Sequence, residues 1–252
     1  MLDAVALRRI QDALVTRAGG YLRNPIRERL ATCSVCTTPV SGYVRCLPCS
    51  KHLAAHGPDL ADAVAPLTYA VGDGNHQAAY MMRGYKATRP VNEHVIVVSM
   101  LTWLGIGLHS GCAGTLLGLP VTHWTTVPSL PPKPGEHPFR RIVAASPPTT
   151  FEVPLSAAAE ADDPREATHS HFTVPRALPP RAHVLILDDT WAKGGHAQSA
   201  ALAVRNAGAE KVSIMIAARW IKRGYADNER FLARLSMDYD PLMCPWTGAA
   251  CP

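Results

Sequence analysis

A pair of adjacent carboxylates, Asp188 and Asp189, is the clearest chemical feature of the sequence. It ends the run 183–188 (HVLILD), whose continuous apolar pattern predicts a strand of a parallel sheet that is buried on both faces. Ligands of such sheets bind beyond the carboxyl ends of the strands. Because carboxylates only accept hydrogen bonds, the pair would suit two sugar hydroxyls or the water molecules around a metal ion.

A glycine-containing loop follows the acids and leads into a predicted helix over 195–207. Glycines let backbone N–H groups approach a phosphate, and the start of a helix adds a favourable field. The candidate phosphate-binding residues are Thr190, Ala192, Lys193, Gly194, Gly195 and His196. The loop and the acid pair together predict a ligand with both a phosphate and a diol. The alternative is an ordinary strand-to-helix turn with an acidic cap and no ligand.

Four cysteines form two closely spaced CxxC pairs, which predicts a zinc knuckle. The predicted ligands are Cys33, Cys36, Cys46 and Cys49. Two thiolate pairs on tight turns can complete a tetrahedron around Zn²⁺, and this module has too few apolar residues to fold by burial alone. His52 or His56 could replace one thiol. A closed four-thiolate site is structural, so we expect no catalysis from it.

The remaining cysteines show no common metal-binding spacing. Cys112 is most simply a small buried residue. Six residues separate Cys244 from Cys251, which favours a frayed or packing tail, with a thiol pair as the alternative. Trp191 could stack on a base or cover the sheet edge, and the sequence does not decide between them.

Hydrophobic periodicity places the elements around these residues. The segments 183–188, 195–207 and 211–218 form a strand, a helix and a strand, and such a βαβ unit implies a parallel sheet. Further strands are predicted at 66–71, 120–128 and near Phe172. Further helices are predicted at 3–30 (one or two), from a cap at Asn75 to Tyr85, at 93–109, 138–145 and 223–235. Residues 146–182 are proline-rich and predict a long connection.

Composition is that of a globular protein. Of the 252 residues, 47% are hydrophobic and 18% charged, and the net charge of +5 is scattered. That charge suits anionic ligands and permits nucleic acid without arguing for it. No apolar run reaches about 18 residues, so we expect no membrane-spanning helix. The first residues lack a signal-peptide core, so we expect a reducing cytoplasm.

The acid pair and the loop resemble the PRPP-binding signature of the type I phosphoribosyltransferases. In that family a hydrophobic strand and two acids precede a Thr-Thr-Gly-x-Thr/Ser loop. Asp188 and Asp189 match the acids, and Gly194 matches the glycine. The resemblance implies that the acids hold the ribose 2- and 3-hydroxyls and the loop holds the 5-phosphate. The family's three hydroxyl positions are occupied here by Ala192, Lys193 and His196.

The cysteine module ahead of this signature makes the chain resemble a divergent member of the ComF family of competence-associated proteins. The segment Arg83-Gly84-Tyr85-Lys86 resembles the family's Lys-x-x-Gly region, and 126–129 (TVPS) lies where its pyrophosphate loop begins. The pyrophosphate side implied by this alignment contains Ser129 and Lys133, with Arg140 and Arg141 nearby. The resemblance spans about residues 31–218 and is most specific at the cysteines and the acid pair.

The resemblance implies an α/β fold with a parallel-sheet type I phosphoribosyltransferase domain, an N-terminal helical segment and a small four-cysteine zinc knuckle. The expected segments are 1–30 (helical), 31–56 (zinc-binding), 62–238 (phosphoribosyltransferase-like) and 239–252 (tail).

Two functions are consistent with these features. The first is a phosphoribosyltransferase that uses PRPP and Mg²⁺ and transfers phosphoribose to an acceptor that the sequence does not identify. The alternative is a non-catalytic protein that senses a nucleotide and uses the zinc module to contact nucleic acid or a protein partner. A phosphorylated sugar or nucleotide is the ligand in both, no membrane is expected, and the oligomeric state stays open, a homodimer included.

Overall fold

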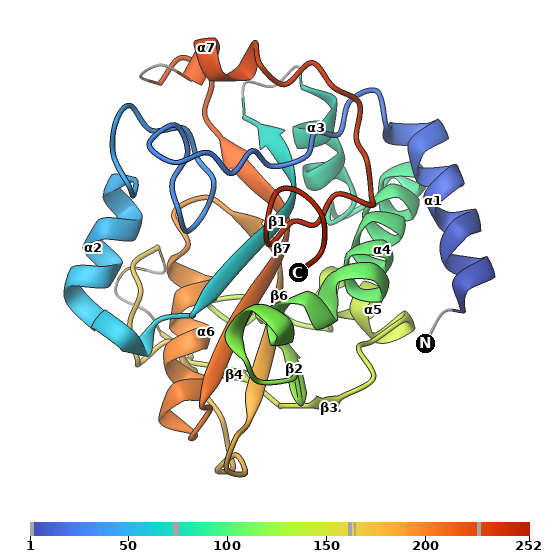
Figure 1. Ribbon diagram of the computed structural model, residues 1–252. Helices are drawn as coiled ribbons and strands as arrows, with labels where there is room; N and C mark the ends of the chain where they lie inside the picture. The colour runs from blue at the N-terminus through green and yellow to red at the C-terminus, as the bar shows by residue number, and fades with distance from the viewer. Residues whose placement is uncertain (1–2, 73–75, 161–162, 164, 226–227) are drawn as a thin grey trace.

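A parallel sheet forms the centre of the structure (Figure 1). The computed structural model describes residues 3–72, 76–160, 163, 165–225 and 228–252. The strands of the sheet are β1 Ala63–Val71, β2 His123–Thr126, β3 Phe151–Glu152, β6 His183–Trp191 and β7 Lys211–Ile221. They stand in the order β1-β7-β6-β2-β3, and all neighbouring pairs are parallel. A separate antiparallel pair joins β4 Ser156–Ala157 and β5 Phe172–Thr173.

Other elements cover both faces of the sheet, as a parallel sheet requires. One side holds the helices α1 Ala4–Ala18, α3 Gln77–Gly84, α4 Asn92–Leu117 and α5 Pro138–Ala145. The other holds α6 Gly195–Asn206 and the cysteine module, which continues into α2 Leu47–His56 and the 3₁₀ turn η1 Gly57–Asp59. A short helix, α7 Asn228–Leu232, packs near the carboxyl ends of β1 and β7. The chain is therefore a mixed α/β protein with a parallel central sheet, as the sequence predicted.

The βαβ unit predicted from the apolar runs is present. β6 and β7 pair in parallel from His183 opposite Lys211 to Trp191 opposite Arg219. The first strand is three residues longer than predicted, because its last residues still pair with β7 after the acid pair. The loop between β6 and α6 therefore contains only residues 192–194.

Helix α4 is longer than the predicted segment 93–109. It continues to Leu117 and ends at Gly118, whose φ of 68° is the left-handed conformation that favours glycine. Polar residues interrupt the apolar run, yet this helix is by length and composition long and apolar enough to cross a membrane. This corrects the expectation from run length. Because 61% of its apolar window is buried inside the protein, α4 has the burial that is typical of a core helix.

Residues 3–30, all of which the structure describes, contain one helix and not two. α1 ends at Ala18, and the chain then runs without regular structure while Leu22 packs into the core that α3 and α4 form on the sheet. Tyr239 and Trp246 of the tail pack into the same core. The segment boundaries predicted from sequence stay predictions, but both ends of the chain contribute to one core.

The long connection contains more structure than predicted. Besides the strand at Phe172 it holds β3 and β4, and β3 forms the edge of the main sheet. The helix predicted over 138–145 has those bounds in the structure, whereas α7 is shorter than the predicted 223–235. The predicted helix cap at Asn75 lies outside the described residues.

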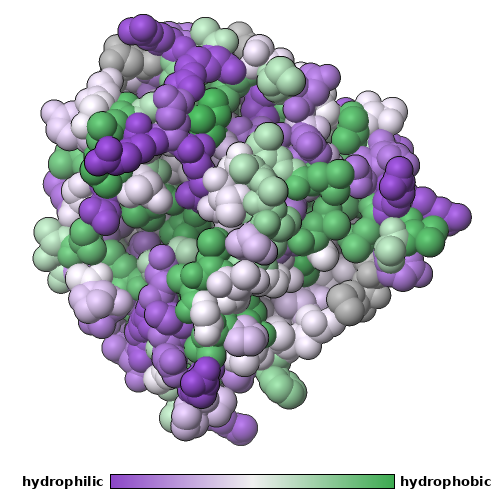
Figure 2. Space-filling model, in the orientation of Figure 1, coloured by the Kyte–Doolittle hydropathy of each residue, from purple (hydrophilic) through white to green (hydrophobic). Residues whose placement is uncertain are grey.

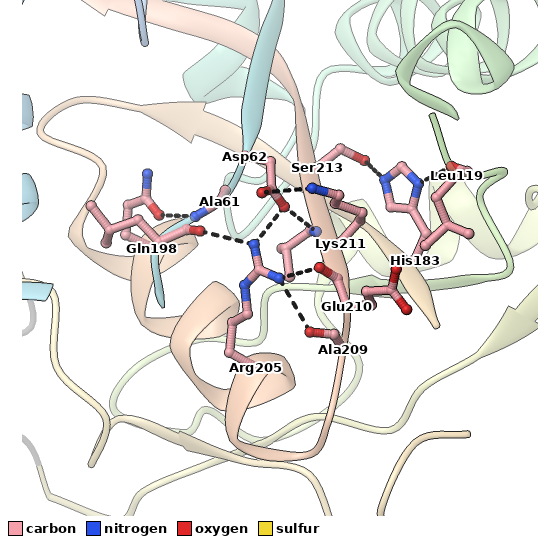
Figure 3. Close-up of polar contacts among 12 residues, drawn as sticks. Ala61, Asp62, Leu119, His183, Gln198, Arg205, Ala209, Glu210, Lys211 and Ser213 are labelled. Atoms are coloured by element: carbon pink, nitrogen blue, oxygen red, sulfur yellow. Dashed lines mark hydrogen bonds and ion pairs between the residues drawn. The ribbon is translucent and has the colours of Figure 1, made fainter. Parts of the chain in front are cut away.

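A polar network fixes the amino ends of the strands (Figure 3). Arg205 at the end of α6 donates to Asp62 (2.5 Å) and to the carbonyl of Glu210 (2.5 Å). Asp62 also accepts from the backbone N–H of Val212 (2.7 Å). His183 bridges the carbonyl of Leu119 (2.7 Å) and the hydroxyl of Ser213 (2.9 Å). This network lies at the amino ends of the strands, whereas the acid pair lies at the carboxyl end of β6. We therefore assign the network a structural role.

Hydrophobic and hydrophilic residues are interspersed on the face shown in Figure 2. Hydrophilic residues gather at the top of this view, over α7 in Figure 1. Arg230 of α7 and Arg234, which follows it, also line a cavity that the cysteine module borders.

Candidate functional site

The direction of the strand order reverses between β2 and β6. From β2 the chain proceeds to β3 on one side, and from β6 it proceeds to β7 on the other. β2 pairs with β6 only as far as Leu187, and the backbone N–H of Val127 still bonds to the Leu187 carbonyl (3.2 Å). Beyond that point β6 continues beside β7 alone. The place where the strand order reverses is a topological switch point, and open parallel sheets bind ligands beyond the carboxyl ends of the strands at such a point.

Asp188 and Asp189 occupy this position, but they face different surroundings. Successive strand residues point to opposite faces. Asp188 therefore follows Ile186 toward the side covered by α6, while Asp189 follows Leu187 toward α3 and α4. This corrects the expectation that both acids hold one diol together.

The two acids also differ in their partners. Asp188 Oδ1 accepts from the backbone N–H of Asp189 (2.8 Å). Asp189 Oδ2 accepts from the Lys86 ammonium (2.6 Å) and from the Tyr85 hydroxyl. Both side chains are almost buried, with residue exposures of 8% and 6%. Lys86 and Tyr85 were noted in the sequence for their place in a family motif, yet no sequence signal linked them to the acid pair.

Burial and mutual repulsion separate the pKa values of the pair. Burial, followed by the charge of Asp189, raises the pKa of Asp188 to about 8. For Asp189, burial acts in the same direction but Lys86 and Tyr85 outweigh it, so its pKa is lowered. At neutral pH the pair therefore holds one proton, which belongs mainly to Asp188.

The start of α6 has no side-chain cap, and backbone atoms of Arg165 pack against it. Gly194 is the N-cap with φ of 91°, and no side chain caps the helix, so the first N–H groups of α6 lack intrahelical partners. A Cβ at Gly194 would lie 2.2 Å from the Trp191 ring. A Cβ at Gly195 would lie 2.1 Å from the carbonyl oxygen of Arg165. Both glycines are therefore required by close packing, and Trp191 is buried beneath the loop and covers the sheet edge.

Cationic and titratable side chains surround the acids. His137 is half-buried, and the charges that act on its pKa are those of Asp189, Lys86 and Lys133. Burial is the largest cause and lowers this pKa. His196 lies on the first turn of α6. Burial lowers its pKa, and the charge of Asp189 acts on it in the opposite direction. His137 is a site residue that sequence spacing did not identify, because the loop after β2 folds back only in three dimensions.

The predicted pyrophosphate side is only partly assembled. Ser129 is half-buried and Lys133 is exposed in the loop that follows β2. Arg140 is not free to meet a ligand, because its guanidinium contacts Glu136 (2.5 Å) and Glu152 (2.7 Å). Arg141 is exposed. On this side the lysine whose charge acts on His137 is Lys133, and Arg140 is held by the two glutamates.

Two cavities open at the carboxyl edge of the sheet, one on each side of the acid pair. The smaller, of about 390 Å³, lies beyond β2 and β3, and its wall includes Thr126 and His137. The larger, of about 840 Å³, lies between the cysteine module and the end of β7. Its wall includes Ala192 and Lys193 of the loop. Its further basic residues are Lys51, Arg219, Lys222, Arg230 and Arg234.

The four predicted cysteine ligands come together. The sulfur atoms of Cys33, Cys36, Cys46 and Cys49 all lie within 4.8 Å of one another, and those of Cys36 and Cys46 are 3.7 Å apart. A zinc–sulfur bond of about 2.3 Å gives a tetrahedral edge of about 3.8 Å, so the sulfurs fit Zn²⁺. His52 and His56 do not belong to this group; His56 bonds instead to the carbonyl of Ala167 (2.8 Å).

Local structure explains how the sulfurs converge. The Cys33 carbonyl accepts from Thr37 N–H (3.0 Å), which closes the first turn, and Thr37 has φ of 58°. Cys46 is the N-cap of α2, and Cys49 lies in its first turn. Helix starts and tight turns of this kind supply the N–H groups that support zinc-bound thiolates.

A buried arginine, Arg219, links the cysteines to the end of β6, next to the loop of residues 192–194. Arg219 Nη1 donates to the carbonyl of Trp191 (2.9 Å). Burial lowers the pKa of Arg219, but the thiols of Cys36, Cys46 and Cys49 outweigh burial and raise it. A buried cation beside four cysteines fits a site whose thiolates carry negative charge. The end of β6 and the cysteine module are thus held by one side chain.

Comparisons with known proteins add little to this geometry. No protein-family model matches the chain, and no curated protein matches it. One solved structure that resembles it is a purine phosphoribosyltransferase from Pyrococcus horikoshii OT3. The match has 12% sequence identity and a TM-score of 0.26, and it covers 50% of this chain and 91% of the other. A likeness at this level carries no argument about family or activity.

Proposed function

We propose that the chain is a phosphoribosyltransferase-like protein that binds PRPP or another ribose 5-phosphate ligand at the carboxyl edge of β6. The observation that carries this proposal is the position of the topological switch. The pairing of β2 with β6 ends at Leu187, directly before the acid pair, and the uncapped start of α6 follows three residues after β6. An anion-binding helix start and a hydroxyl-binding acid, Asp188, then stand side by side, as a sugar phosphate requires.

The 5-phosphate is assigned to the first N–H groups of α6. They need no hydroxyl side chains, so Ala192 and Lys193 do not prevent binding, and the exposed Lys193 adds a charge. Asp188, on the α6 side of the sheet, is the acid placed to accept from the ribose hydroxyls. Asp189 is assigned to holding Lys86, whose ammonium can approach a diphosphate from the other side of the acid pair.

In the enzyme version, catalysis consists of positioning and charge stabilisation. The bond between the anomeric carbon and the diphosphate oxygen breaks, and the electron pair leaves with the diphosphate. An acceptor nucleophile then bonds to that carbon and loses its proton. Mg²⁺ bound to the diphosphate would neutralise the leaving group. Lys86 and His137, whose charges act on Asp189, and Lys133, whose charge acts on His137, are the protein groups that can add to this, and the acceptor remains unassigned.

Calorimetric titration tests the proposal. The full chain is titrated with PRPP plus Mg²⁺, with ribose 5-phosphate and with inorganic phosphate. We expect binding of the two sugar phosphates to be tighter than that of phosphate, and Asp188→Ala to weaken it by about tenfold or more, as loss of a buried hydrogen-bond partner does. Asp12→Ala, at an exposed position of α1, is the matched control. The proposal fails if no heat is seen at millimolar sugar phosphate.

The larger cavity favours a second candidate function. Its wall joins the cysteine module to Lys193 and to basic residues near α7, and this is a surface that a nucleic-acid backbone could follow. The chain would then be a ComF-like, non-catalytic binding protein. Fluorescence anisotropy with single-stranded DNA over a salt series separates the two. A steep loss of affinity with salt that Lys222→Ala reduces would support it, and absence of binding at low salt would exclude it.

A further inference from the structure

A second group of metal-binding side chains lies on the opposite side of the sheet from the four-cysteine module. His109 and Cys112 come from α4, and Cys244 and Cys251 come from the tail. One ligand atom from each lies within 4.8 Å of all the others. Trp246 and Cys244 belong to the core around α4, whereas Cys33 and Cys36 belong to the core around α6. The two groups are therefore separate sites.

The local structure explains how these four residues meet. His109 and Cys112 are three residues apart in a helix, so their side chains point in the same direction. In the tail, the N–H of Gly248 bonds to the Cys244 carbonyl (2.8 Å) and the N–H of Cys244 bonds to the Ala249 carbonyl (2.8 Å). This turn brings the chain back toward α4, beside which the tail runs in Figure 1.

The histidine is oriented as metal-binding histidines usually are. His109 Nε2 lies 2.9 Å from the carbonyl oxygen of Pro241. A carbonyl only accepts, so Nε2 carries the hydrogen and Nδ1 keeps its lone pair. Nδ1 lies 3.4 Å from the sulfur of Cys251. Zinc-bound histidines commonly donate their second N–H to a carbonyl, which fixes the ring and the tautomer.

The surroundings also fit thiolate ligands. Cys244 is fully buried, Cys112 is nearly so, and His109 is 3% exposed. Trp246 Nε1 donates to the His109 carbonyl (2.8 Å), which holds the turn against α4. The half-buried Arg27 donates to the carbonyl of Pro245 (2.8 Å), next to Cys244. A cation at this position offsets the negative charge that three thiolates would bring.

We propose that His109, Cys112, Cys244 and Cys251 form a second structural zinc site, which fastens the tail to α4. Three thiolates and one imidazole are a common closed ligand set for structural Zn²⁺. Because two ligands lie on a core helix and two lie on the tail turn, the metal would hold the tail against α4. The metal would close the loop between Cys112 and Cys244 and would add to the contacts that the tail already makes with the core. The proposal does not depend on the sugar-phosphate site.

Metal content tests the proposal directly. The full chain is purified under reducing conditions with zinc, and native mass spectrometry counts the ions. We expect two zinc ions per chain in the natural sequence and one in Cys251→Ser. Cys46→Ser should also retain one, and the double variant none. Met237→Ser, at an exposed position in the same part of the chain, is the control and should retain two. A single zinc in the natural sequence, with Cys251→Ser unchanged, would overturn the proposal.

A second measurement needs no variant and so avoids misfolding. Cys251 is exposed, and a free thiol there should react readily with iodoacetamide. In the zinc-loaded chain we expect alkylation of Cys251 to be slower by about tenfold or more than after chelation, because a zinc-bound thiolate is a poorer nucleophile. Equal rates would refute the site. A disulfide that includes Cys251 in the chain as purified, with one zinc per chain, would refute it as well.

Discussion

At the scale of single residues, the site depends on the contrast between two neighbouring carboxylates. Asp189 has a cation and a hydroxyl as partners, and Asp188 has one backbone N–H. The same residue type is therefore ionised at one position and protonated at the next. A protonated Asp188 can donate to a ligand oxygen, while an ionised Asp189 keeps Lys86 in place.

This contrast predicts a pH-dependent stability. The folded-state pKa of Asp188 is raised to about 8, so its contribution is fully favourable below the unfolded value and is lost as pH rises toward 8. Asp188→Asn is a neutral substitute for the protonated acid. We expect it to stabilise the fold at pH 9, by a margin on the order of 1–5 kcal/mol, and to have little effect at pH 4.

Urea unfolding of both chains at the two pH values measures this effect. Asp12→Asn, at an exposed position in α1, is the matched control and should shift neither midpoint. A difference between Asp188→Asn and the natural chain that is the same at pH 4 and pH 9 would show that folding does not raise the pKa of Asp188. The acid assigned to the ribose would then have to be reconsidered.

At the scale of elements, the strand-to-helix connection is specified by packing as much as by ligand chemistry. Three residues join β6 to α6, and the Trp191 ring fills the space that a side chain at 194 would need. The glycine pattern of this loop would therefore be required even in a protein that had lost its ligand. The uncapped start of α6 is the feature that suits an anion, and the adjacent acids suit hydroxyl groups.

A substitution at Gly194 tests this packing against Trp191 directly. Gly194→Ala would place a Cβ within 2.2 Å of the Trp191 ring at a φ of 91°. We expect a loss of about 2–4 kcal/mol in the free energy of unfolding, from chemical denaturation. Gly111→Ala is the matched control, because it lies in α4 with no atom within 4 Å of the added Cβ. It should be neutral or stabilising by roughly 0.5–1 kcal/mol. Equal losses in both variants would contradict the packing argument.

At the scale of the whole molecule, the sheet separates two metal-compatible clusters. The four-cysteine module closes one face next to the ligand edge, and the group on α4 closes the other. Arg219 connects the first cluster to the end of β6 through the Trp191 carbonyl. Loss of metal from the module should therefore also change the structure or dynamics of the loop after β6, residues 192–194.

Cys46→Ser tests this coupling. Removing one ligand should release one zinc ion, leave Arg219 beside a depleted cluster and lower the free energy of unfolding by about 3 kcal/mol or more. Hydrogen exchange should also increase at 191–196. Ser50→Ala, at an exposed position in the first turn of α2, is the control and should change neither property. Increased exchange confined to residues 31–56 would show that the module folds independently of the loop.

Much of the architecture was predictable because its signals are local. The apolar runs of β6 and β7, with a helical period between them, require a parallel sheet wherever they occur. The bounds of α5 and the four cysteine ligands also follow from residues a few positions apart. Local patterns failed where pairing partners set the length of an element, as for the end of β6, and where an interrupted apolar run formed one long helix, as for α4.

Contacts between distant segments were decided by the tertiary structure alone. Spacing gives no indication that Lys86 pairs with Asp189, more than a hundred residues away, or that His109 meets Cys251. The order of the strands, and thus the switch point beside Asp188, is equally absent from any local pattern. The physical reason is that periodicity indicates which side of an element is buried, but not which other element packs against that side. A site forms where distant elements pack together, so local patterns do not identify its partners.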